Sequence, residues 1–128
     1  MTRLFFVTDV HGSERCFRKF VNAGKFYGAN VLVLGGDITG KMIVPLVEQP
    51  DGSRKCEYAG IEYNLKSREE IDGMVKGIRD SGYYPYYSDP KEMLELSAKP
   101  EMVHQLFVKL MKESIAGWMT LAEERLKG

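Results

Sequence analysis

The chain has 128 residues, 44% of them hydrophobic and 28% charged, with 18 basic residues balancing 18 acidic ones. This composition is sufficient to bury a core and excludes a disordered tail. A formal net charge of zero gives no general attraction for nucleic acid or for an anionic membrane, so neither partner is inferred. The length predicts a single domain over residues 1–128.

Localisation and redox state follow from what the sequence lacks. Its apolar runs are far shorter than the roughly 20 residues of a membrane-spanning helix. The N-terminus has no basic segment, apolar stretch and cleavage site typical of a signal peptide, so a cytoplasmic protein is expected. Cys16 and Cys56 lie outside any metal-binding spacing, which predicts two reduced thiols, with Cys16 directed toward the core from a helix.

The first 40 residues predict a βαβ unit. Residues 4–7 and 31–34 are short continuous apolar runs, typical of buried parallel strands. Between them, Ser13 can cap a helix that ends within residues 24–28. Such units are right-handed and place the carboxyl ends of both strands at one edge of a parallel sheet.

Three side chains able to bind a metal follow these strands. Asp9 and His11 come after the first strand, and Asp37 comes after the second. Because open α/β sheets bind ligands beyond the carboxyl ends of their strands, we expect the three side chains to converge there. Carboxylate oxygen and neutral imidazole suit Mn, Fe or Zn.

Glycines accompany these side chains. Gly12, Gly35 and Gly36 would let the backbone turn sharply and approach a metal or a phosphate without a Cβ clash. Taken singly, an aspartate at the end of a strand can simply cap a turn, and Gly-Gly-Asp can be an ordinary loop. The combination with His11 favours a site.

The next segment predicts short strands. Residues 42–47 and 54–58 flank a turn signal at 49–52, so a β-hairpin is expected, and residues 61–65 add a third strand. We expect residues 41–66 to form a β-hairpin insertion that covers one edge of the site.

Residues 67–128 predict a helical segment. Ser67 and Glu70 form a capping box for a helix that ends at Gly82, and Asp89 caps a short helix to about residue 98. A last helix over residues 100–127 carries a broad apolar stripe, part of which could stay exposed and drive self-association. The tyrosines within residues 83–87 form either an aromatic platform for a ligand ring or an extended segment packed over a helix.

The order Asp9-Val10-His11-Gly12 and then Gly36-Asp37 resembles the opening of the calcineurin-like metallophosphoesterase superfamily. That family continues with Gly-Asn-His or Gly-Asn-Asp and two later histidine motifs. The resemblance implies that Asp9 and His11 bind a first metal and that Asp37 bridges two. It also implies hydrolysis of a phosphomonoester or phosphodiester by a metal-bound hydroxide.

The later motifs of the family are absent. Asn22, Asn30 and Asn64 each lack a preceding glycine, and His104 lies within an amphipathic helical pattern as an ordinary structural histidine. The expected fold is therefore the N-terminal half of a metallophosphoesterase sandwich: a βαβ metal-binding core over residues 1–40, then the hairpin insertion and the C-terminal helices. We expect a truncated or fragmentary domain that holds at most one of the two metals and is weakly active or inactive.

Other interpretations remain open. A noncatalytic α/β module for metal binding, nucleotide binding or assembly would keep the fold without hydrolysis. A haloacid-dehalogenase-like phosphatase would require Asp-x-Asp after the first strand, which His11 argues against. The expected small-molecule partner is a phosphate-ester substrate. Either a second copy of the chain or a complementing C-terminal segment is also expected, because a sheet with only two predicted parallel strands has exposed edges.

Overall fold

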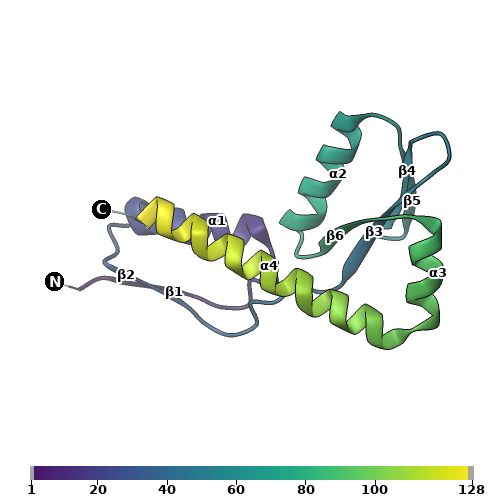
Figure 1. Ribbon diagram of the computed structural model, residues 1–128. Coiled ribbons are helices and arrows are strands. Elements are labelled where there is room, and N and C mark those ends of the chain that lie inside the picture. The colour runs from purple at the N-terminus through teal and green to yellow at the C-terminus, as the bar shows by residue number, and fades with distance from the viewer. Residues whose placement is uncertain (1, 127–128) are drawn as a thin grey trace.

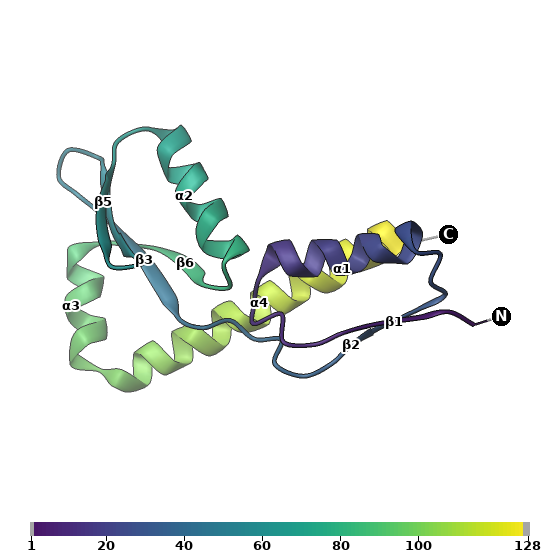
Figure 2. The same ribbon diagram turned by 180° about the vertical axis from the view of Figure 1, so that it is seen from behind.

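The computed structural model describes residues 2–126 and confirms an α/β chain. The elements, in order, are β1 (Leu4–Val7), α1 (Glu14–Phe26), β2 (Val31–Leu34), β3 (Ile43–Glu48), β4 (Arg54–Tyr58), β5 (Ile61–Leu65), α2 (Arg68–Asp80), β6 (Tyr84–Ser88), α3 (Pro90–Ala98) and α4 (Pro100–Leu126). They form two lobes along the long helix α4 (Figures 1 and 2). Among the described helices, none has the length and apolar character needed to cross a bilayer.

The first lobe is the βαβ unit. Strands β1 and β2 pair in parallel, from Leu4 opposite Val31 to Val7 opposite Leu34. The Ser13 side chain caps α1 by accepting a hydrogen bond from the N–H of Cys16 at 3.2 Å. Helix α1 then packs its apolar stripe against one face of this two-stranded sheet. The predicted strand–helix–strand order is confirmed.

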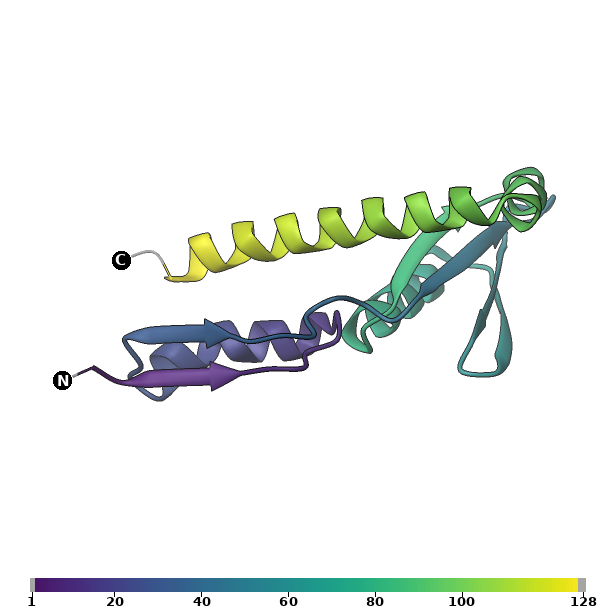
Figure 3. The ribbon, with the colours of Figure 1, turned by 90° about the horizontal axis from the view of Figure 1, so that it is seen from below.

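Helix α4 completes the core of the first lobe. Its Trp118 stacks on Phe17 of α1, with ring centroids 4.5 Å apart and planes 11° apart. Within residues 100–126, Trp118 is the one residue of α4 that is buried. Part of the apolar stripe of this helix is therefore exposed, as predicted from its breadth. Figure 3 shows α4 running from the second lobe to the first.

The other face of the β1–β2 sheet carries exposed apolar side chains. Leu4, Phe6 and Val31 are 62%, 57% and 40% exposed. Parallel sheets are normally covered on both faces, and a two-stranded sheet has two open edges. This face is therefore an apolar surface suited to a further layer of protein.

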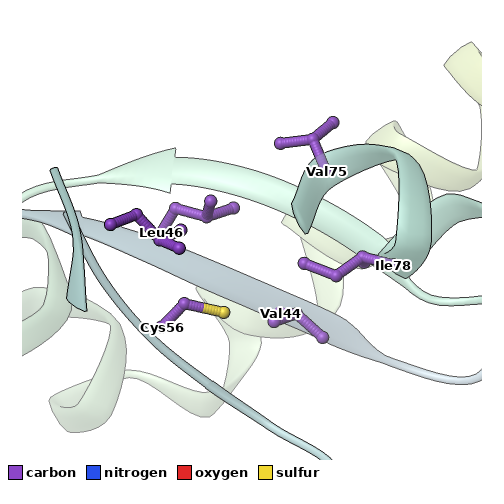
Figure 4. Close-up of a cluster of buried hydrophobic side chains, with 6 residues drawn as sticks. Val44, Leu46, Cys56, Val75 and Ile78 are labelled. Carbon is purple, nitrogen blue, oxygen red and sulfur yellow. The ribbon is translucent and has the colours of Figure 1, made fainter. Parts of the chain in front are cut away.

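The second lobe is a mixed four-stranded sheet in the order β5-β4-β3-β6. Strands β3 and β6 are parallel, whereas β3–β4 and β4–β5 are antiparallel. Helix α2 covers one face of the sheet. The buried cluster between them (Figure 4) consists of Val44, Leu46, Cys56, Leu65, Val75 and Ile78.

The extended alternative for the tyrosine segment is confirmed, since it forms strand β6, which joins the hairpin strands in one sheet. In this sheet, Tyr84 to Ser88 pair with Ile43 to Val47. The Tyr-Pro-Tyr-Tyr pattern does not predict this pairing, because the two strands are distant in sequence. The helical segment predicted over residues 67–128 is therefore interrupted by a strand, and the expectation for Cys16 is corrected. Cys16 is exposed rather than directed toward the core, because α1 buries the neighbouring stripe of Phe17, Phe20 and Val21.

The turn between β4 and β5 offers a test of the second lobe. Ala59 and Gly60 form a two-residue turn with φ of 54° and 77°, which is the conformation favoured by Asn-Gly. Ala59→Asn should raise the free energy of unfolding by about 1 kcal/mol, because asparagine tolerates the left-handed conformation better than alanine. Urea denaturation would measure this change.

A matched control for this substitution is Ala116→Asn, at an exposed position inside α4. Asparagine is a poorer helix former than alanine, so stability should fall there. A loss of stability in Ala59→Asn as well would contradict the left-handed turn.

Candidate metal centre

The loops that follow β1 and β2 continue to pair beyond the strands. The N–H of Asp9 donates to the carbonyl of Gly36 at 3.0 Å, and the N–H of His11 donates to the carbonyl of Asp37 at 2.9 Å. The hydroxyl of Thr8 also donates to the Gly36 carbonyl, at 3.1 Å. Backbone hydrogen bonds therefore hold the two loops side by side, over the span that carries the predicted ligands.

All three predicted ligands have left-handed backbone conformations. The φ angles of Asp9, His11 and Asp37 are 59°, 48° and 54°. This region costs an ordinary L-residue roughly 1–2 kcal/mol, although aspartate and histidine enter it more readily than most residues. Strain of this kind clusters at functional sites. Its occurrence at each of the three predicted ligands sets this edge of the sheet apart from an ordinary loop.

The three side chains lie together. One donor atom from each of Asp9, His11 and Asp37 falls within 4.8 Å of the others. The Nε2 atom of His11 is 4.0 Å from Oδ1 of Asp9, and both side chains are about half exposed, at 51% and 52%. The predicted convergence is confirmed, and the cluster is open to solvent and so to a ligand.

The electrostatics of the cluster favour a bound cation. The neighbouring Asp37 raises the pKa of Asp9 above its usual value, first by a hydrogen bond between the two carboxyl groups, then with partial desolvation and charge repulsion, while His11 acts in the opposite direction. Two carboxylates and an imidazole form a donor set that suits a first-row divalent ion. A cation there would replace the proton and relieve the repulsion.

The glycines have distinct structural roles. The N–H of Gly12 donates to the Ile38 carbonyl at 2.9 Å, and that of Gly35 donates to Val7 at 2.7 Å, so both amides are used in holding the loops. A Cβ at Gly36 would meet nothing within 4 Å. Contact of these glycines with a phosphate stays a prediction, with Gly36 the most open of the three.

The donor set stops at three. Within residues 2–126, Asp9, His11 and Asp37 form the one group of three or more such side chains close enough to hold a metal. Asn22 instead accepts a hydrogen bond from Arg125 at 3.0 Å, and the side chain of Asn30 accepts one from the backbone of Arg3 at 3.0 Å.

His104 and Asn64 also lie away from the cluster. His104 is an exposed residue of α4, and Asn64 lies in β5, opposite Lys55. His104 does not belong to the metal-binding group found within the described chain.

Contacts from the second lobe were not predicted from the sequence. The segment between α2 and β6 lies against the loop that carries His11, and Tyr84 reaches the loop that follows Asp37. No local pattern indicates these contacts, because they join segments distant in sequence.

In comparisons with known proteins, no family model, no curated protein and no solved structure matched the chain. The resemblance to calcineurin-like metallophosphoesterases therefore depends on the motif residues of the sequence alone.

The carboxyl pair predicts a gain of stability when its charge is reduced. Asp9→Asn should raise the melting temperature of the metal-free protein at pH 7. The reason is that the folded chain keeps the Asp9 proton to a higher pH than the unfolded chain, so stability falls as pH rises from 3.8 through the raised pKa. The gain should vanish below pH 3.8, where the carboxyl is protonated in both states. Added Mn²⁺ should raise the melting temperature of the parent chain but not that of Asp9→Asn.

Asp72→Asn is the matched control. Asp72 is an exposed helical carboxylate 3.3 Å from Arg68, so its loss should leave stability nearly unchanged and the Mn²⁺ response intact. A metal-free Asp9→Asn protein no more stable than its parent at pH 7 would argue against repulsion within the cluster.

Proposed function

We propose that this chain carries the first metal-binding half of a metal-dependent phosphoesterase related to the calcineurin-like superfamily. The main support is the convergence of Asp9, His11 and Asp37, each in a left-handed conformation, within 4.8 Å at the carboxyl edge of a parallel strand pair. The substrate would be a phosphomonoester or a phosphodiester.

The residues have separate parts in this proposal. Asp9 and His11 would hold a divalent Mn, Fe or Zn ion, and the Asp37 carboxylate would bridge it to a second ion in a complete site. Such ions offset the repulsion between an anionic ester and its nucleophile and lower the pKa of water. The exposure of all three side chains leaves room for a phosphate group to reach the cluster.

The three donors are too few for two ions. We therefore propose that a complementing C-terminal segment or a second copy of the chain supplies further nitrogen and oxygen ligands. The exposed side chains of Leu4, Phe6 and Val31 on the same sheet support an added layer of protein beside the cluster. In this proposal the 128-residue chain alone holds at most one ion and hydrolyses esters weakly.

Hydrolysis of p-nitrophenyl phosphate and bis(p-nitrophenyl) phosphate with added Mn²⁺ tests this function. The chain alone should bind Mn²⁺ with little turnover, and Asp37→Asn should lose the binding. Addition of a complementing C-terminal segment should raise turnover by at least about 100-fold, as metal-assisted catalysis allows. Robust turnover by the 128-residue chain would refute the proposal of an incomplete site.

A noncatalytic α/β binding or assembly module is the second candidate, favoured by the small number of donors. It predicts metal or nucleotide binding without hydrolysis even after a complementing C-terminal segment is added. The same assay therefore separates the two candidates.

Self-association is tested by light scattering across a concentration series. Because Phe6 is exposed on an uncovered sheet face, Phe6→Lys should shift an associating chain toward the monomer. Leu94→Lys, at a residue 73% exposed on α3 of the other lobe, should have no such effect. A parent chain that is monomeric at all concentrations would exclude the second-copy alternative.

A further inference from the structure

The chain passes from the first lobe to the second between β2 and β3, and this connection is hydrogen-bonded to the turn between α2 and β6 in the second lobe. The N–H of Lys41 donates to the Gly82 carbonyl at 2.8 Å, and the N–H of Tyr84 donates to the Met42 carbonyl at 2.9 Å. These bonds lead directly into the parallel pairing of β3 with β6. The loop after Asp37 is therefore continuous with the sheet of the second lobe.

Tyr84 reaches back to that loop from the second lobe. Its hydroxyl accepts a hydrogen bond from the N–H of Gly40 at 2.7 Å, and its side chain is buried, with 5% of the residue exposed. A Cβ on Gly40 would lie 2.7 Å from Cε2 of the Tyr84 ring, so only glycine permits this approach. Burial raises the pKa of Tyr84, which keeps its hydroxyl neutral.

Gly82 reaches the other metal-binding loop. A Cβ at this position would overlap the carbonyl oxygen of His11, so the two backbones are in direct contact. The hydroxyl of Ser13 also donates to the Asp80 carbonyl at 2.5 Å, at the end of α2. The loop that carries His11 therefore packs against the second lobe, at the segment just before β6.

Gly12 joins the two contacts. A Cβ on Gly12 would lie 2.7 Å from the backbone nitrogen of Gly40, so the two metal-binding loops are also packed against each other at the lobe junction. Each loop that supplies a predicted ligand therefore contacts the second lobe within three residues of that ligand, one through the His11 carbonyl and the other through the Gly40 N–H.

We propose that Tyr84 and Gly82 are positioning residues for the metal centre: the second lobe, through these two contacts, fixes the loops that hold Asp9, His11 and Asp37. This inference rests on the proposed metal-binding function. In this proposal, the packing of the second lobe against the metal-binding loops determines metal affinity, although neither Tyr84 nor Gly82 supplies a ligand. The strained φ angles of the three ligands then persist because both loops are held from two sides.

The first test compares Tyr84→Phe with Tyr86→Phe. Each substitution removes one tyrosine hydroxyl from β6, but Tyr86 donates to Glu92 at 2.9 Å inside the second lobe, whereas Tyr84 accepts from the metal-binding loop. Tyr84→Phe should weaken Mn²⁺ binding about tenfold, the lower range for loss of a group that orients a ligand. Tyr86→Phe should leave Mn²⁺ affinity unchanged.

A second readout needs no metal. Hydrogen exchange of the His11 and Gly12 amides, which bond to Asp37 and Ile38, should be about tenfold faster in Tyr84→Phe than in Tyr86→Phe. If the parent chain binds no Mn²⁺, the proposed function fails, and the exchange rates still decide whether Tyr84 holds the loop. Equal exchange in the two variants would overturn the positioning role.

Gly82→Ala against Gly60→Ala gives an independent comparison. Both glycines have positive φ, of 90° and 77°, so both substitutions strain the backbone. Only at Gly82 does the added methyl meet His11, because a Cβ at Gly60 has nothing within 4 Å. Faster exchange at His11 in Gly82→Ala alone supports the proposal, whereas the same change in both variants contradicts it.

Discussion

The continuation of parallel pairing past the ends of β1 and β2 is the constraint on which the candidate site depends. Strand pairing ends at Val7 and Leu34, but backbone hydrogen bonds between the loops continue to Gly12 and Ile38. This pairing brings ligands that are far apart in sequence within reach of one another. Without it, repulsion between the Asp9 and Asp37 carboxyl groups, which His11 offsets only in part, would favour their separation.

The second lobe gives this pairing a rigid support. Its sheet is stabilised by its own core with α2, and its junction with the first lobe includes close contacts at Gly12, Gly40 and Gly82, of which that at Gly40 is with the Tyr84 ring. Interiors packed this closely transmit strain rather than absorb it. A change in the packing between the lobes would therefore alter the conformation of the metal-binding loops. The uncovered face of the β1–β2 sheet remains available for another layer of protein.

Several features could be predicted because their causes are local. The apolar runs at β1 and β2 are confirmed as strands, and the caps at Ser13, Ser67 and Asp89 each accept the expected backbone hydrogen bond. An extended conformation was one of the two alternatives predicted for residues 83–87, but the pairing of β6 with β3 could not be predicted, because Pro85 lacks a donor and β3 is distant in sequence. The exposure of Cys16 depends on which stripe of α1 meets the sheet, a choice that tertiary packing makes.

The sequence by itself determined the chemistry of the cluster and its place at the carboxyl edge of a βαβ unit, because right-handed crossovers leave one arrangement for Asp9, His11 and Asp37. Tertiary structure decided the left-handed backbone at these residues, the four-stranded second sheet and the contacts of Tyr84 and Gly82 with the metal-binding loops. The physical reason is that strand pairing and close backbone contacts join segments that are remote in sequence. Such contacts stabilise the chain only after folding has brought both segments together.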